Sequence, residues 1–246
     1  MHLYRTNFVG EIVAEFLPPK HPSNDVVILC DGLPTERSKK QLVEWFSQKN
    51  FWTFHIHYRG TWESGGCFLD HPPEQDILDV ITALPNGFTD VWSGESFALQ
   101  PGRVSVIGAS FGGTAALMAS LHPVVRNAIA ISPVIDWTVD ADEPMDWLER
   151  VIHNGYLGAY RFAHEDWMRL SRGEFFQPIA HADEFDPGKI FLVHARDDRV
   201  VPIGPAHTFV EQVKCAYRFY ETGGHNLRPK LLRWPTASRL LRFIHS

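Results

Sequence analysis

Residues 104–118, with the sequence VSVIGASFGGTAALM, decide the fold prediction. The stretch opens with a β-branched run, which predicts a buried strand, and closes with residues that favour a helix. Between them lies Gly108-x-Ser110-x-Gly112, the pattern of a nucleophile elbow. The sharp turn puts the serine in a strained conformation and leaves no room for side chains two residues before or after it. We therefore predict that the Ser110 hydroxyl projects from the carboxyl end of a sheet. The same pattern also occurs by chance in glycine-rich loops, so the flanking strand and helix carry the prediction.

Composition favours a single globular domain. The chain has 246 residues, of which 44% are apolar, and this length supports one α/β domain with a large core. The net charge of −6 gives no reason to expect a nucleic-acid partner. No apolar run approaches the roughly 20 residues that cross a bilayer, and the first residues lack the pattern of a signal peptide. The three cysteines have no metal-type spacing, and we expect Cys30 and Cys215 to be buried thiols in a cytoplasmic protein.

Short apolar runs alternate with helical patterns along most of the chain. Such alternation predicts a mostly parallel sheet with helices on both faces, the α/β class. Residues 8–17 predict an early antiparallel edge strand, and residues 85–102 predict a loop. Further strands are predicted at residues 26–30, 51–58, 104–107, 127–132, 189–194 and 215–221, and helices at 36–49, 72–84, 204–214 and 237–244, with one more from Phe111 that ends by Pro123.

The alternation stops between the two parts of this predicted core, residues 8–135 and 189–246. Residues 136–188 contain no convincing strand, have helical patterns at 144–152 and 165–170, and are rich in aromatic side chains. A long excursion inside a compact domain is usually functional, so we expect a small helical cap over the mouth of the site. The alternative is a helical excursion on the domain edge, with the aromatic residues as its own core.

Two loops downstream of the elbow supply the other residues that a serine nucleophile needs. Such a nucleophile requires a base to take its proton and a carboxylate to orient that base. Asp198 follows the predicted strand 189–194, and His225 follows the predicted strand 215–221. The order Ser110, Asp198, His225 is the order expected for a strand–elbow–helix nucleophile. Asp197 is the alternative acid, and a surface-loop histidine is the alternative for His225.

The chain resembles serine hydrolases of the α/β-hydrolase superfamily from about residue 8 to residue 244. The elbow GASFGG, residues 108–113, is similar to that of the prolyl oligopeptidase-like and related esterase branches. Residues 194–202, HARDDRVVP, resemble the H-G-x-x-D-x-x-V-P segment of these proteins, and the alignment selects Asp198 over Asp197. The resemblance implies an α/β-hydrolase fold, typically with an eight-stranded sheet, and a Ser110–Asp198–His225 triad.

The expected oxyanion hole departs from the pattern of the family at one position. One donor is the N–H of Phe111, directly after the nucleophile at the start of the helix. The family often has His-Gly after the third strand, where this chain has Asp31-Gly32-Leu33. We expect the N–H of Leu33 to be the second donor. The Asp31 carboxylate would oppose an oxyanion if it pointed inward, and a bond to the loop backbone is the expected alternative.

These residues predict a carboxylic ester hydrolase that forms an acyl-enzyme on a small-molecule ester with an apolar or aromatic group, without a cofactor. A peptidase is one alternative, because acidic residues of the predicted cap could anchor a substrate amine. The other interpretation of these acidic residues is a solvated helix face. The acidic residues are Asp140, Asp142, Glu143, Asp146 and Glu149. A non-catalytic binding protein of the same fold is another alternative. A homodimer is possible.

The pair His55-x-His57 would share one face of a strand, but no third metal ligand is evident, so no metal is predicted.

Overall fold

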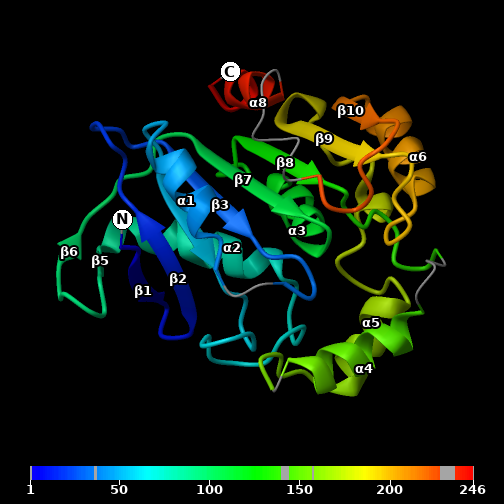
Figure 1. Ribbon diagram of the computed structural model, residues 1–246, viewed down its shortest axis with the longest axis horizontal. Helices are drawn as coiled ribbons and strands as arrows, with labels where there is room; N and C mark the ends of the chain where they lie inside the picture. Colours follow the sequence, from blue (N-terminus) through cyan, green and yellow to red (C-terminus); the bar gives the residue numbers. More distant parts are fainter. Residues whose placement is uncertain (1, 36–37, 140–143, 157, 228–235, 246) are drawn as a thin grey trace.

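The computed structural model describes residues 2–35, 38–139, 144–156, 158–227 and 236–245 and contains one large sheet (Figure 1). The order of its eight strands is β1-β2-β4-β3-β7-β8-β9-β10. β2 pairs antiparallel with both of its neighbours, and all pairs from β4 to β10 are parallel. The predicted α/β class is confirmed. The strands are β1 (Tyr4–Phe8), β2 (Ile12–Leu17), β3 (Val26–Cys30), β4 (Trp52–Ile56), β7 (Val104–Ala109), β8 (Asn127–Ile131), β9 (Ile190–Ala195) and β10 (Ala216–Tyr220).

Helices pack on both faces of the sheet because the central strands are apolar on both sides. Alternate residues of β3 point to opposite faces of the sheet. Val26 and Ile28 pack in a first core, and Val27 and Leu29 pack in a second core on the other face. The first core also takes apolar residues of α2 (Glu74–Ala83), α3 (Phe111–Ser120) and α6 (Ile203–Val213). The second takes those of α1 (Lys40–Ser47) and α8 (Thr236–His245). None of the helices in the described residues is long and apolar enough to span a bilayer.

The predicted edge strand at residues 8–17 is wrong in its extent. The structure has a hairpin there, with β1 at the edge of the sheet and β2 inside it. Val9 and Gly10 both have positive φ, 47° and 79°, and turn the chain between the two strands. The expected loop at residues 85–102 likewise contains a small hairpin, β5 (Phe88–Thr89) and β6 (Ser96–Phe97). Both short pairs lack the long alternation that a sequence pattern needs.

Residues 136–188 carry α4 (Met145–Gly155), α5 (His164–Ser171) and the 3₁₀ turn η2 (Pro178–His181), and a second turn, η3 (Pro187–Lys189), leads into β9. In Figure 1, α4 and α5 lie beyond the end of the sheet. The loop after β4 anchors this segment: Arg161 N–H donates to Gly60, and Phe68 N–H donates to Arg161, each at 2.7 Å. The segment is thereby tied to the sheet at the end where the parallel strands finish.

Candidate active site

Ser110 stands on a strained turn between β7 and α3, as the elbow pattern predicts. Its φ and ψ are 56° and −126°, a conformation that side chains rarely adopt. A Cβ on Gly108 would lie 1.9 Å from the Gly112 carbonyl oxygen, and one on Gly112 would lie 2.5 Å from the Asp31 carbonyl oxygen. Glycine is therefore required at both positions by close backbone approach.

Asp198 and His225 come together from two loops at the same end of the sheet. His225 Nδ1 lies 2.9 Å from Asp198 Oδ2, while Asp198 Oδ1 accepts the N–H groups of Val200 and Val201 at 3.0 Å. Burial alone would raise the pKa of Asp198, but bonds from His194, His225 and Val201 hold this pKa well below its usual range. The carboxylate is therefore ionised at neutral pH and can orient the His225 ring.

The neighbouring Asp197, which sequence alone leaves as an alternative acid, has a different position. Its two carboxylate oxygens accept the N–H groups of Gly223 and Gly224 at 3.1 and 2.8 Å. These are the residues directly before His225. Asp197 therefore holds the loop that carries the histidine, and Asp198 faces the ring itself.

The two residues expected to form an oxyanion hole, Phe111 and Leu33, both line the cavity with Ser110. Phe111 is the first residue of α3, so its N–H has no partner inside the helix. Leu33 follows Gly32, where a Cβ would lie only 3.6 Å from Ser110 Cβ. Among the described residues, the structure gives neither N–H an acceptor. Both are free to bind an oxygen placed beside Ser110.

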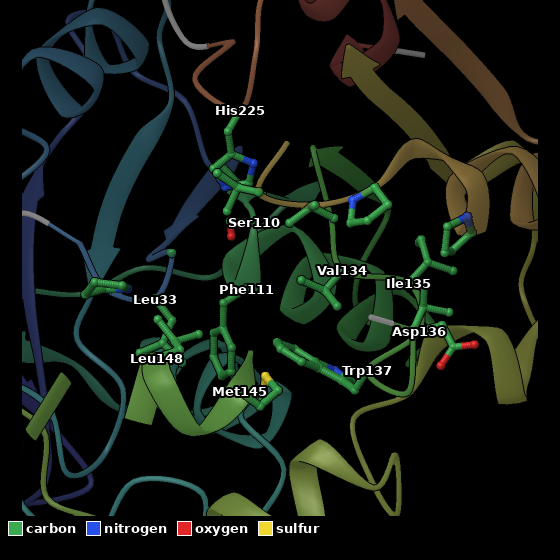
Figure 2. Close-up of a pocket in the computed structure, with 18 of the residues that line it drawn as sticks. Leu33, Ser110, Phe111, Val134, Ile135, Asp136, Trp137, Met145, Leu148 and His225 are labelled. Atoms are coloured by element: carbon green, nitrogen blue, oxygen red, sulfur yellow. The ribbon is translucent and has the colours of Figure 1, made fainter. Parts of the chain in front are cut away.

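Ser110 and His225 open into one cavity of about 800 Å³. Figure 2 shows His225 directly beside Ser110, with Phe111, Trp137, Met145 and Leu148 on the far wall. Most of the lining is apolar, and three parts of the chain supply it: the ends of β3, β7 and β8, the segment 144–151, and the loops after β9 and β10. The size and lining suit a small organic molecule with a bulky apolar part.

The aromatic residues of segment 136–188 divide into two groups. Trp137 and Trp147 line the cavity, whereas Tyr160, Trp167 and Phe176 are buried in packing contacts. Trp137 is fixed by a 2.7 Å bond from its indole N–H to the Phe176 carbonyl oxygen. The segment therefore both extends the first core of the domain and supplies a wall of the cavity.

The structure brings a third metal-ligating side chain to the pair His55 and His57, which sequence alone does not reveal. Asp31 lies with both histidines in a buried group whose ligand atoms are within 4.8 Å of one another. However, Lys39 Nζ lies 2.7 Å from Asp31 Oδ1, and His55 Nε2 lies 2.8 Å from the same oxygen. A buried ammonium already balances the carboxylate, so these residues do not fit a divalent cation.

The acidic residues of the predicted cap do not form a described amine site. Asp140, Asp142 and Glu143 lie outside the described residues. Asp146 is exposed and pairs with Arg150 at 3.3 Å, and Glu149 lies 2.8 Å from His164. Neither acid lines the cavity, where Asp136 is the only carboxylate among the described lining residues.

Sequence reasoning misses two residues that the geometry brings to the site. Lys39 lines the cavity beside Leu33, and its side chain is only 8% exposed. His194, inside β9, donates toward Asp198 from 3.3 Å and lies 3.0 Å from the Val201 carbonyl oxygen. Lys39 has no motif to mark it, whereas His194 was visible as the first residue of the segment HARDDRVVP.

The fold and the site define an α/β-hydrolase, and sequence comparison gives the family. The profile of the prolyl oligopeptidase family matches residues 37–230, a stretch that includes Ser110, Asp198 and His225. The chain belongs to the prolyl oligopeptidase family. A search of curated protein sequences finds no match.

Solved structures of the same fold include esterases and a peptidase. The Pyrococcus furiosus esterase Pf2001 superposes with a TM-score of 0.71 at 16% identity, over 99% of this chain and 90% of the esterase. Est1E from Butyrivibrio proteoclasticus gives 0.67 at 15% identity, over the whole of both chains. The acylaminoacyl peptidase of Pyrococcus horikoshii gives 0.64 at 16% identity, but this chain spans only 40% of it. These likenesses confirm the predicted fold.

Proposed function

We propose that the protein is a serine hydrolase that cleaves carboxylic esters through an acyl-enzyme on Ser110. The observation that carries the proposal is the convergence of Ser110 and the Asp198–His225 pair on one apolar cavity. The predicted ester hydrolase also agrees with the esterases among the structural neighbours.

The mechanism follows from the geometry. Ser110 Oγ attacks the ester carbonyl while His225 takes its proton, and Asp198 fixes the histidine tautomer and stabilises the imidazolium. The N–H groups of Phe111 and Leu33 hold the oxyanion, each contributing about 3–4 kcal/mol in the transition state. His225 then gives its proton to the leaving alcohol and activates the water that releases the acid. The mechanism needs no cofactor or metal.

We further propose that residues 136–188 act as a cap that selects the substrate. Met145, Trp147, Leu148 and Val151 of α4 form the cavity wall opposite the elbow, which supports this role. The esters expected to fit are of small to medium size and carry an apolar or aromatic acyl or alcohol group.

The peptidase reaction is the second candidate, and the acylaminoacyl peptidase among the structural neighbours favours it. The same triad would attack an amide, with His225 protonating the leaving amine. Asp136, at the edge of the cavity, is the carboxylate that could pair with a substrate amine.

Cytoplasmic location remains a prediction, supported by three free cysteines, of which Cys30 and Cys215 are buried. The homodimer also remains a prediction, which sedimentation velocity would measure.

A series of p-nitrophenyl esters from acetate upward, assayed beside p-nitroanilides, tests the proposal. We expect ester turnover with a chain-length optimum, and we expect Ser110→Ala to reduce it by about 10³-fold or more. Anilide cleavage faster than ester cleavage would favour the peptidase. Absence of turnover, or turnover unchanged in Ser110→Ala, would contradict both and favour the binding protein.

A further inference from the structure

A buried carboxylate lies directly behind the predicted oxyanion loop. Asp31 is 3% exposed and directly precedes Gly32, where an added Cβ would lie 3.6 Å from Ser110 Cβ. Its backbone also packs against Gly112 of the elbow. Because Asp31 is buried, its negative charge is screened by water less than a surface charge would be.

Lys39 supplies the compensating charge. Its ammonium lies 2.7 Å from Asp31 Oδ1 and donates to Thr35 Oγ1 at 2.8 Å. The same side chain lines the cavity together with Leu33 and Ser110. Lys39 therefore contacts the loop of Leu33 from both sides, at Asp31 and at Thr35.

A histidine beside Asp31 is shared with a second carboxylate. His55 lies between Asp31 Oδ1, at 2.8 Å, and Glu15 Oε2, at 3.9 Å. Glu15 is balanced by Arg5 at 3.0 Å. Among the residues that the structure describes, Lys39 is the only lysine or arginine within ion-pair distance of Asp31.

We propose that Lys39 is a positioning residue for ester hydrolysis, whose ammonium balances the charge of Asp31 next to the loop that carries the Leu33 N–H. The proposal rests on the proposed function. An ester forms an oxyanion beside Leu33 as the transition state is reached, and an unbalanced Asp31 would repel that charge. Lys39 therefore affects the transition state much more than the bound ester, and the effect falls on kcat rather than on KM.

A double-mutant cycle tests this role: Lys39→Met, Asp31→Asn and the double variant, each assayed below its unfolding temperature. The matched control is Arg103→Met. Arg103 pairs with Asp25 at 2.7 Å, at the opposite end of β3. Each variant is assayed with a p-nitrophenyl ester and with an aryl trifluoromethyl ketone. Ser110 Oγ adds to the ketone carbon and the serine proton moves to His225, so the ketone oxygen becomes an anion that mimics the transition state.

We expect Lys39→Met to lower kcat by about 50-fold and to weaken binding of the ketone by a similar factor, because it leaves the buried charge of Asp31 without its ammonium partner. KM should stay within about twofold of the wild-type value. Asp31→Asn should keep kcat within about threefold, since it removes the charge that Lys39 balances. Adding Lys39→Met to Asp31→Asn should then cost less than about threefold, and Arg103→Met should change kcat less than about twofold.

Three results would overturn the proposal. The first is wild-type kcat and ketone affinity in Lys39→Met. The second is a loss on adding Lys39→Met to Asp31→Asn as large as the loss in the wild type. If Lys39→Met alone does not fold, the pair of variants in the Asp31→Asn background still decides. The third is a wild-type enzyme without Ser110-dependent turnover, which would reject the proposed function as well; the first two leave that function intact.

Discussion

Two buried aspartate–histidine pairs stand at the carboxyl end of the sheet, and they differ in what surrounds the imidazole. Asp198 Oδ2 lies 2.9 Å from His225, and Asp31 Oδ1 lies 2.8 Å from His55. The His225 side chain is 27% exposed and faces the cavity beside Ser110, whereas His55 is fully buried (Figure 2). A carboxylate contact is therefore not enough to make a general base. The second ring nitrogen must also reach the nucleophile.

The two carboxylates differ in their remaining partners as well. Asp198 receives backbone N–H groups and His194, and no lysine or arginine among the described residues pairs with it. Asp31 is paired with Lys39. Burial would raise the pKa of Asp31, but His55 and Lys39 lower it to about 2. We infer that the first pair is built for proton transfer and the second for charge balance.

The largest expected difference between the pairs is catalytic. Asp198→Asn should lower kcat by about 10⁴-fold, because asparagine cannot hold His225 in the productive tautomer. Ester hydrolysis at saturating substrate measures this, with Asp31→Asn as the matched control that keeps most of its activity. A loss below about tenfold in Asp198→Asn would reject its assignment as the triad acid.

The next difference is in stability. Asp31→Asn should lower the free energy of unfolding by about 3 kcal/mol, because it leaves the Lys39 ammonium buried without a carboxylate. Urea unfolding measures it. Asp25→Asn is the control, since the more exposed Asp25–Arg103 pair should contribute about 1 kcal/mol. Equal losses in the two variants would show that the Asp31–Lys39 pair contributes no more to the free energy of unfolding than the more exposed Asp25–Arg103 pair does.

The pH dependence of stability should separate Asp31 from its neutral replacement. The folded pKa of about 2 lies below the ordinary value of 3.8, so the charge of Asp31 stabilises the fold above pH 4. This contribution, roughly 2 kcal/mol, is lost as the pH falls from 4 toward 2. The stability gap between wild type and Asp31→Asn should therefore narrow over that range in urea titrations. A gap that stays constant would contradict the low pKa.

The smallest expected effect belongs to the neighbouring acid. Asp197→Asn should lower kcat/KM by less than about tenfold, because an amide oxygen can still accept one of the two loop N–H groups. The same ester assay measures it beside Asp198→Asn. Equal losses of kcat/KM in Asp197→Asn and Asp198→Asn would contradict the separate roles given to the two aspartates, one for the loop that carries His225 and one for its ring.

Sequence reasoning predicts most of the fold and the residues Asp198 and His225 that the structure brings together. The elbow is predictable because Gly108 and Gly112 are required by backbone contacts within a few residues, and the central strands because they are apolar on both faces. Sequence reasoning misses the turn at Val9 and Gly10 because a three-residue connection between two strands interrupts the alternation too briefly. Lys39 was missed because its role depends on Asp31, which becomes its neighbour only when the loop after β3 folds back.

The most direct test of the account is covalent labelling with a fluorophosphonate, followed by peptide mapping by mass spectrometry. The account predicts one adduct per chain on Ser110, absent in Ser110→Ala, strongly slowed in Asp198→Asn and close to the wild-type rate in Asp31→Asn. An adduct on any other residue, or labelling that is slowed equally by the two aspartate variants, would contradict the distinction between the two pairs.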